Sequence, residues 1–271
     1  MTEPEGDESP VLVEIPHAGL ALDAETLSTL VAPARCVGRD ADLFVDRLYA
    51  DAPSVGSSLL VAHTSRYVVD LNRAETDVDG ESVWGMGGPH RASRGVVWRL
   101  TSDGLPALAH PLPRSEFERR LATYYHPYHR ALRALLEHKI ARFGLAVVLA
   151  AHSMPSSART GHGDVGRTRA DVVPGTQGRT SAASSFIDAV EQAARGAGLS
   201  VAHDEPYKGG FTTLHYGRPE GKVHVVQVEL ARRLYMDEAT LREHEGFPVL
   251  KRFCTGMVAG LVARARAFRS R

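Results

Sequence analysis

The chain has 271 residues, and its 32 basic side chains balance its 32 acidic side chains, so the formal net charge is zero. A hydrophobic fraction of 43% with 24% charged residues is typical of a folded globular protein rather than a disordered one. The neutral charge argues against a nucleic-acid-binding protein, because such proteins owe most of their affinity to contacts with phosphates.

The longest unbroken apolar run covers residues 145–151, seven positions, whereas a membrane-spanning helix needs roughly 20. The first ten residues, MTEPEGDESP, are acidic and polar, unlike the basic and then apolar start of a signal peptide. The two cysteines, Cys36 and Cys254, are too few for a disulfide framework. We therefore expect a cytoplasmic protein with no membrane or nucleic-acid partner; the sequence does not indicate its oligomeric state.

Short apolar runs alternate with segments of helical periodicity along most of the chain. This pattern predicts a disordered tail over residues 1–10 and one α/β domain over 11–271, with a sheet covered on both faces. The apolar runs predict strands at 11–15, 58–63, 67–71, 145–151, 199–202 and 223–230. The helical patterns cover 43–50 with Asp42 as its cap, 115–143 with Ser115 as its cap, 181–195, and 247–268.

Two long segments, residues 75–113 and 154–180, do not fit this alternation. The first carries many glycines and prolines and both tryptophans, and the second is rich in Gly, Ser, Thr and Arg. Long irregular segments often carry function. Because both follow predicted strands, we expect them to form walls of a binding site.

A histidine follows an apolar run at two places in the chain. His17 lies in PHAG after the first predicted strand, and His152 lies in HSM after residues 145–151. Imidazole is the commonest zinc ligand at neutral pH, and strands that end at one edge of a sheet can bring two imidazoles to one metal ion. A hydrolytic zinc site adds a carboxylate and leaves one position for water. Asp42 and Asp46, one helical turn apart, can face the same side.

Glu229 is a carboxylate within the apolar run VHVVQVELA. Residues two apart in a strand share a face, so Gln227 and Glu229 point the same way. An acidic side chain in such a run is costly unless it is paired or protonated. One interpretation is a buried salt bridge with Arg232 or Arg233; the other is a general base beside a metal-bound water.

Two further positions are candidates for binding a substrate carboxylate. Asn72 and Arg73 follow the predicted strand 67–71, and a guanidinium there can bind a carboxylate through two parallel hydrogen bonds. Arg179 precedes a predicted helix, whose free backbone N–H groups favour anions. The alternative for each arginine is an ordinary solvated charge.

With these residues in view, the chain resembles the N-formylglutamate amidohydrolase family from Val11 to about Asp237. The resemblance is carried by motifs that occur in the same order, and an ordered set is far more specific than any single motif. The motifs are PHAG at 16–19, DLFVDRLY at 42–49, SRYVVDLNR at 65–73, AHS at 151–153, GTQGRT at 175–180, YKGGFTTLHYG at 207–217 and QVEL at 227–230.

The resemblance implies a fold like that of the zinc carboxypeptidases and the phosphorylase/hydrolase type, a single catalytic domain with a mixed β-sheet and helices on both faces. It implies that Zn²⁺ or another divalent transition metal is bound by His17, Asp42 and His152, with Asp46 as the fallback carboxylate. It also implies that Glu229 is the general base.

Two positions depart from related patterns. Carboxypeptidase relatives use a His-x-x-Glu pair, and Leu20 stands where that glutamate would be. Members of the family carry an aspartate two residues before the histidine of the His-Ser motif, where this chain has Ala150. A carboxylate there would orient the metal-binding imidazole, and loss of such a partner weakens metal binding or activity by roughly 10–100-fold.

The activity that the resemblance implies is hydrolysis of an N-acyl amino acid, N-formyl-L-glutamate to formate and L-glutamate. Arg73 and Asn72 would bind one substrate carboxylate and Arg179 the other, with further cations from the Arg-rich segment 159–179. The remaining predicted substrate residues are Arg66 and His215 as donors to the negative oxygen, and Lys208, Gly209 and Gly210 as a lid.

Three alternatives remain open at this point. Two belong to the same class of enzyme: a small metallocarboxypeptidase, and a deacylase for another N-acyl amino acid. The third is a non-catalytic homologue that binds an amino acid, which Ala150 keeps open. A substrate panel distinguishes the enzymes, and binding without turnover identifies the non-catalytic homologue.

Overall fold

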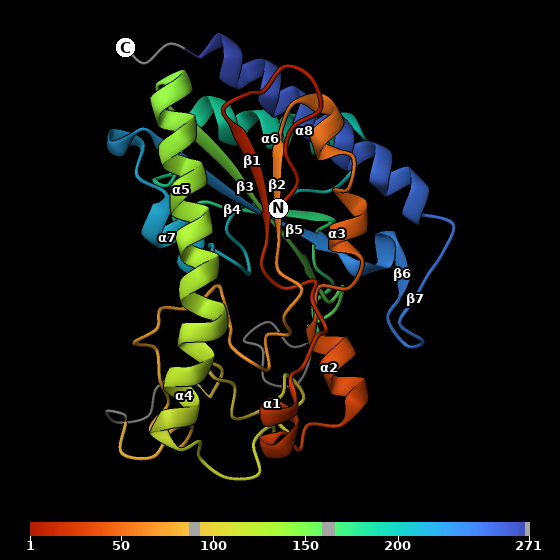
Figure 1. The fold of residues 1–271 in the computed structure, drawn as a ribbon. Helices are drawn as coiled ribbons and strands as arrows, with labels where there is room; N and C mark the ends of the chain where they lie inside the picture. The colour runs from red at the N-terminus through yellow and green to blue at the C-terminus, as the bar shows by residue number, and fades with distance from the viewer. Residues whose placement is uncertain (87–92, 159–165, 269–271) are drawn as a thin grey trace.

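A computed structural model of the chain describes residues 1–86, 93–158 and 166–268, and a five-stranded sheet forms its centre (Figure 1). The strand order is β2-β1-β3-β5-β4, in which β4 runs antiparallel to β5 and the other neighbours are parallel. This confirms the mixed sheet. The strands are β1 (Val11–Ile15), β2 (Ser58–Val61), β3 (Ala146–Met154), β4 (Val172–Gly175) and β5 (Val223–Ala231).

Helices cover both faces of the sheet, as predicted (Figure 1). One face packs against α3 (Val45–Leu48), α6 (Ser184–Gly196) and α8 (Phe247–Ala267). The other face packs against α4 (Arg114–Arg120), a π-helical segment (Leu121–Tyr125), α5 (His126–Phe143) and α7 (Phe211–Tyr216). Below the sheet in Figure 1 lie α1 (Ala24–Thr29) and α2 (Ala34–Asp40). The short elements are 3-10 helices at Ala52–Val55, Pro219–Gly221 and Arg232–Leu234, and a hairpin of β6 (Met236–Asp237) and β7 (Arg242–Glu243).

The two faces of the sheet build two separate apolar cores. The odd-numbered apolar residues of β1 and β3 join the core beneath α6 and α8. Of the even-numbered residues, Leu12, Ala146, Val148 and Ala150 join the core beneath α5. Every residue of β3 is buried, which explains why its sequence reads as a continuous apolar run rather than an alternating one. Gly144 ends α5 with a φ of 81°, a conformation that glycine adopts without strain.

The order of the strands places a crevice between β1 and β3. The chain leaves β1 to form β2 on one side and later returns as β3 on the other side. In sheets of this kind ligands bind beyond the carboxyl ends of the strands at the point where the strand order reverses. Both strand-end histidines lie at this point.

The N-terminal tail differs from the prediction, because residues 1–10 pack on the domain instead of being disordered. The backbones of Thr2 and Leu59 exchange two hydrogen bonds, of 2.8 and 3.0 Å. Ser9 is fully buried, and its Oγ donates to the carbonyl of Gly56 at 2.8 Å. Glu8 forms an ion pair with Lys139. The acidic and polar composition of residues 1–10 suggested disorder, but the hydrogen bonds and the ion pair with the domain provide partners for the polar groups of this segment.

Two predicted strands are absent from the described structure. Residues 67–71 form turns, because the backbone N–H of Asp70 bonds to Val96 in the following loop rather than to a neighbouring strand. Residues 199–202 contribute only an isolated bridge from Val201 to Val172. Conversely, β4 was not predicted; it is a four-residue edge strand within the segment 154–180 and contains Pro174.

The helix predicted at 115–143 begins one residue earlier than expected, and Pro113 rather than Ser115 is its cap residue. The π-helical segment interrupts it between α4 and α5. The helix predicted at 181–195 begins at Ser184. The described parts of 75–113 contain no regular element, as predicted. Residues 159–165, part of the Arg-rich segment, lie outside the described residues. No helix within the described ranges is long and apolar enough to cross a membrane.

Candidate metal centre

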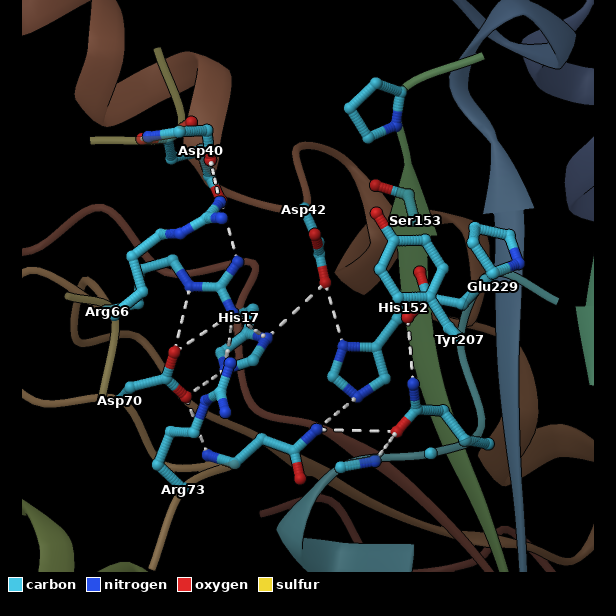
Figure 2. Close-up of a pocket in the computed structure, with 18 of the residues that line it drawn as sticks. His17, Asp40, Asp42, Arg66, Asp70, Arg73, His152, Ser153, Tyr207 and Glu229 are labelled. Carbon is cyan, nitrogen blue, oxygen red and sulfur yellow. Dashed lines mark hydrogen bonds and ion pairs between the residues drawn. The ribbon is translucent and has the colours of Figure 1, made fainter. Parts of the chain in front are cut away.

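Two histidines meet at the carboxyl edge of the sheet, where β1 and β3 end side by side (Figure 2). His17 and His152 are each 3% exposed, and their ring centroids lie 5.0 Å apart. Gly19 allows the loop after β1 to pass close to the end of β2: a Cβ atom on Gly19 would lie 2.2 Å from the carbonyl carbon of His63. The two imidazoles therefore converge, as their positions at strand ends predict.

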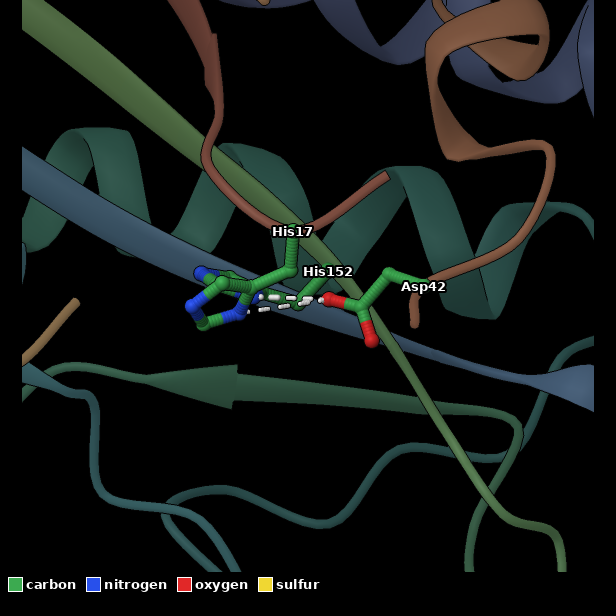
Figure 3. Close-up of side chains that lie close together, drawn as sticks. All are labelled: His17, Asp42 and His152. Atoms are coloured by element: carbon green, nitrogen blue, oxygen red, sulfur yellow. Dashed lines mark hydrogen bonds and ion pairs between the residues drawn. The ribbon is translucent and has the colours of Figure 1, made fainter. Parts of the chain in front are cut away.

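Asp42 brings a carboxylate to the same point from the loop between α2 and α3 (Figure 3). Its Oδ2 lies 3.0 Å from Nδ1 of His152 and 3.7 Å from Nδ1 of His17. Each of the three side chains offers one ligand atom within 4.8 Å of the others, so the group could hold a metal ion. Asp42 is not the predicted helix cap, because α3 begins after Phe44 and makes no side-chain cap hydrogen bond.

The charges around Asp42 keep it ionised. Burial alone would raise the pKa of Asp42, but the hydrogen bond from His152 and the nearby charges of His152 and His17 outweigh that effect and hold its pKa well below the usual value. Desolvation would lower the pKa of His152, but the hydrogen bond that its Nδ1 donates to Asp42 helps to raise it. On the other side, Nη2 of Arg232 lies 3.3 Å from Oδ1 of Asp42. Arg232 thereby leaves Oδ2 directed at the histidines.

This contact bears on the salt-bridge interpretation of Glu229. Arg232 pairs with Asp42, and Arg233 pairs with Asp171 at 2.7 Å. The predicted salt bridge from Glu229 to either arginine is therefore wrong, because both guanidinium groups are engaged elsewhere.

Asp70 fixes the orientation of His17 and was not singled out from the sequence. Its Oδ1 accepts a hydrogen bond from Nε2 of His17 at 2.8 Å, which places the ring proton on Nε2 and makes Nδ1 the acceptor of the ring. Nη2 of Arg66 lies 2.8 Å from that Nδ1 and 3.1 Å from Oδ2 of Asp70. Trp98 donates to the same Oδ2 at 2.9 Å.

The available signal for Asp70 was its position in the apolar run 67–71, the same signal that identified Glu229. Burial would raise the pKa of Asp70, but the charges of His17 and Arg66 outweigh it and lower the pKa. Asp70 therefore remains an acceptor for the imidazole proton.

Glu229 lies on β5 directly opposite His152 in the strand register. It is 6% exposed, and Nε2 of Gln227 donates to its Oε1 at 2.9 Å. Burial raises the pKa of Glu229, and the nearby charge of His152 opposes that shift only in part. A carboxylate with a raised pKa accepts protons more readily, which is what a general base requires.

Backbone N–H groups at the start of α7 fix two side-chain amides of the site. Gly210 N donates to Oε1 of Gln227 at 2.8 Å, so Nε2 of Gln227 is left to face Glu229. Thr212 N donates to Oδ1 of Asn72 at 2.8 Å, so Nδ2 of Asn72 is left 3.3 Å from Nε2 of His152. A Cβ atom on Gly210 would lie 2.3 Å from Nδ2 of Asn72, so only glycine permits this approach.

These groups line one cavity of about 330 Å³, a volume suited to a small molecule. Most of the predicted substrate residues lie on its wall: Arg66, Asn72, Arg73, Lys208, Gly209 and Gly210. The Arg73 side chain is 44% exposed, and its Nη1 lies 3.6 Å from Oδ2 of Asp77. Arg39, Arg94 and Tyr207 also line the cavity; Tyr207 belongs to the motif at 207–217, and nothing in the sequence marked the two arginines.

Three predicted residues lie elsewhere. Arg179 forms ion pairs with Asp188 and Glu191 of α6 and does not line the cavity. His215 stacks on Phe211 with ring centroids 4.7 Å apart, also outside the cavity. Asp46 lies in α3 and is not part of the His/Asp group found among the described residues.

The motif that contains Arg179 supports the wall of the cavity instead. The backbone N–H of Gln177 donates to the carbonyl of Lys208 at 2.8 Å, and its Nε2 donates to the carbonyl of Gly209 at 2.9 Å. The motif therefore supports the loop that carries Lys208, and Gln177 itself does not line the cavity.

The chain matches known proteins over most of its length. Residues 9–236 match the family model described as N-formylglutamate amidohydrolase. An N-formylglutamate deformylase of Pseudomonas aeruginosa is 38% identical over 234 residues, which cover 84% of this chain and 83% of that protein. An N-formylglutamate deformylase of Pseudomonas putida is 32% identical over 259 residues, which cover 92% of each chain.

Solved structures agree with these matches. The crystal structure of N-formylglutamate amidohydrolase from Ralstonia eutropha JMP134 superposes with a TM-score of 0.88 at 32% identity, covering 98% of this chain and 97% of that one. A gene product of Agrobacterium tumefaciens has a TM-score of 0.62 at 19% identity, covering 95% and 92%. The second likeness concerns the fold alone.

Proposed function

The chain belongs to the N-formylglutamate amidohydrolase family and is a hydrolase that acts on an amide bond, and on this premise we propose that it cleaves N-formyl-L-glutamate to formate and L-glutamate. We further propose that His17, Asp42 and His152 hold a divalent ion that takes part in the reaction, zinc or another metal that accepts nitrogen and oxygen ligands. The observation that carries the proposal is the meeting of these buried side chains beside Glu229 in one cavity.

The donor set fits a tetrahedral zinc ion with one open position. Ligand atoms around such an ion lie about 3.3 Å apart, given bonds of about 2.1 Å, and Oδ2 of Asp42 lies 3.0 and 3.7 Å from the Nδ1 atoms of His152 and His17. Nδ1 of His17 carries no proton and lies beside an ionised carboxylate, and both groups are acceptors of the kind that ligate a cation. When bound, the ion would polarise the formyl carbonyl and lower the pKa of its water towards about 7.

Glu229 is the group to which we assign the proton transfers. It takes a proton from the attacking water, whose oxygen bonds to the formyl carbon, and returns that proton to the nitrogen as the C–N bond breaks. The raised pKa of Glu229 favours the first step, and the hydrogen bond from Gln227 holds the carboxylate in place for the second. The products, formate and the free amino group of glutamate, account for all atoms of water and substrate.

A dicarboxylate substrate needs cations to offset the loss of its hydration. Arg73, half-exposed at the mouth of the cavity, is assigned to one carboxylate together with Asn72. Lys208 is assigned to the other, because Arg179 is engaged with α6. Arg66 stands beside His17, held by Asp70, and is assigned to stabilise the negative charge that develops on the carbonyl oxygen.

A substrate panel tests this assignment. We expect the highest kcat/KM for N-formyl-L-glutamate, measured by formate release, and lower values for N-formyl-L-glutamine and N-acetyl-L-glutamate. Faster cleavage of the N-acetyl compound would make the chain a different deacylase, and faster cleavage of a peptide with C-terminal glutamate would make it a carboxypeptidase. Tight binding of N-formyl-L-glutamate without turnover of any compound would contradict catalysis altogether.

A further inference from the structure

Glu14 is a fully buried carboxylate that the reaction described above does not use. It lies on β1, three residues before His17, and pairs in register with Ala150 of β3. Paired residues of neighbouring strands point to the same face, and so do residues two apart along one strand. Glu14 and His152 therefore share a face of the sheet, on diagonal positions of β1 and β3.

Only one oxygen of Glu14 is hydrogen-bonded within the described structure. Oε1 accepts from the hydroxyl of Tyr128 at 2.6 Å and lies 3.4 Å from Oγ1 of Thr212. Oε2 is buried and has no hydrogen-bond partner among the described residues. A buried acceptor without a partner costs stability. The chain thus carries an unused acceptor immediately behind its candidate metal centre.

The neighbouring residue leaves space for this acceptor. Ala150 of β3 is fully buried and pairs in register with Glu14 of β1 on one side and with Gln227 of β5 on the other. Its methyl group is the smallest of the three side chains. An aspartate, which the family resemblance leads one to expect at position 150, would place its carboxylate next to the position of Glu14. The direction of the charge effects agrees with this placement: burial raises the pKa of Glu14, and His152 is the strongest influence that opposes the shift.

The imidazole of His152 needs such an acceptor once a metal ion binds. An imidazole that ligates through Nδ1 carries its proton on Nε2, and metal-binding histidines usually donate that proton to a carboxylate or carbonyl. The group that faces Nε2 of His152 is Nδ2 of Asn72, at 3.3 Å. This is a donor, and Thr212 N holds the amide in that orientation through Oδ1. Asn72 therefore cannot accept the proton without losing its bond to Thr212.

We propose that Glu14 is the positioning residue that accepts the Nε2 proton of His152 through Oε2 when the metal site is filled. In this role a carboxylate on β1 replaces the one that Ala150 lacks on β3. The inference rests on the metal site of the proposed function and adds to it the group that orients one of the ligands. It assigns Glu14 no contact with the substrate.

Zinc affinity of the Glu14→Gln variant tests the proposal directly. Glutamine keeps the size of the side chain but loses the charged acceptor, so we expect zinc to bind roughly 10–100-fold more weakly in competition with a chromophoric chelator. The metal-free variant should unfold at the same or a higher urea concentration, because a buried carboxylate has been removed. A purely structural role predicts the opposite pair of results, lower stability and unchanged affinity.

Two further variants sharpen the test. Glu14→Ala with Ala150→Asp moves the carboxylate to the register partner, and we expect it to bind zinc more tightly than Glu14→Ala alone. Glu191→Gln removes a largely buried carboxylate on α6, outside the cavity, and should leave zinc affinity unchanged. Equal zinc affinity of Glu14→Gln and the unmodified protein would overturn the inference and leave the proposed function intact. An unmodified protein that binds no zinc would instead overturn the metal site itself.

Discussion

The two edges of the sheet both bury charge, but they do so differently. At the amino edge, Nζ of Lys139 is buried and lies 2.8 Å from Oε1 of Glu8 and 2.8 Å from the carbonyl of Ser9. At the carboxyl edge, Nδ1 of His17 accepts from Nη2 of Arg66 at 2.8 Å and lies 3.7 Å from Oδ2 of Asp42. The amino edge pairs a cation with a carboxylate, whereas the carboxyl edge gathers two imidazoles and a carboxylate whose ligand atoms lie within 4.8 Å of one another.

This difference separates a structural cluster from a functional one. A buried ion pair with complete hydrogen bonding holds the tail to the domain and offers nothing to a ligand. Two imidazoles and a carboxylate gathered this closely form a group that could hold a cation. The sequence identifies His17 and Asp42 because histidine and aspartate are typical metal ligands. It does not identify the structural role of Glu8, because a glutamate in an acidic tail looks like an ordinary surface charge.

The largest effect should come from the carboxyl edge. Glu229→Gln keeps the hydrogen bonding and size of the side chain but cannot accept a proton, so kcat for formate release should fall by on the order of 10²–10⁴-fold. Bound metal should be unchanged, as measured by elemental analysis of the purified variant. Turnover equal to that of the unmodified protein would remove Glu229 from the reaction.

The amino edge should respond in stability rather than in activity. Lys139→Met leaves Glu8 without its buried partner, and we expect a loss of about 3–5 kcal/mol in the free energy of unfolding, measured with urea. Formate release by the folded protein should not change. Arg142→Gln is the matched control, because Arg142 pairs with the same Glu8 from an exposed position and should cost about 1 kcal/mol or less. Equal losses of unfolding free energy in Lys139→Met and Arg142→Gln would show that the buried ion pair contributes no more to stability than the exposed one.

Within the carboxyl edge, two arginines should behave differently. Arg73→Ala removes a cation from the cavity wall, and KM for N-formyl-L-glutamate should rise by roughly 10–100-fold, as expected for a charged hydrogen bond of about 1.5–3 kcal/mol. Arg179→Ala should leave KM nearly unchanged, because Arg179 pairs with Asp188 and Glu191. Similar KM values for both variants would mean that Arg73 does not bind substrate.

The smallest effect should be the response of the amino edge to acid. Burial would raise the pKa of Glu8, but hydrogen bonds from Lys139 and His138 outweigh it and lower the pKa. As the pH falls, Glu8 therefore takes up a proton in the unfolded chain before it does so in the folded protein. The stabilisation by Glu8 is present above the ordinary glutamate pKa of about 4.3 and is lost as the pH falls below it. Urea unfolding across pH should give Glu8→Gln a lower free energy of unfolding than the unmodified protein at pH 7. The difference should shrink as the pH falls below about 4.3. A constant difference would exclude Glu8 as its source.

The sequence predicts the parts of the fold that depend on short-range patterns. The continuous apolar runs of β1, β3 and β5 identify the buried strands, and Gly144 marks the end of the long helix. The same pattern predicts a strand at residues 67–71 that does not form. An apolar run cannot reveal that the backbone N–H of Asp70 bonds to Val96 and its carboxylate to His17, rather than the segment pairing with a neighbouring strand. Edge strand β4 is short and contains Pro174, so its pattern is weak.

The candidate site shows the same division. His17 and His152 are predictable, because each follows a strand and strand ends gather at one edge. Asp70 and Arg232 are not, because their roles depend on partners 53 and 190 residues away in the chain. Arg179 was expected at the substrate but lies outside the cavity, since sequence alone does not show that α6 supplies its counter-ions.

The central claim is that the converging acceptors of the carboxyl edge hold a metal ion that the reaction requires. The most direct test is to strip the purified protein with a chelator, add Zn²⁺ in steps and measure formate release from N-formyl-L-glutamate at each step. We expect the rate to rise in proportion to bound zinc and to level off at one ion per chain, and a His17→Ala/His152→Ala variant to show neither binding nor turnover. Full turnover by protein that elemental analysis finds free of metal would contradict the account.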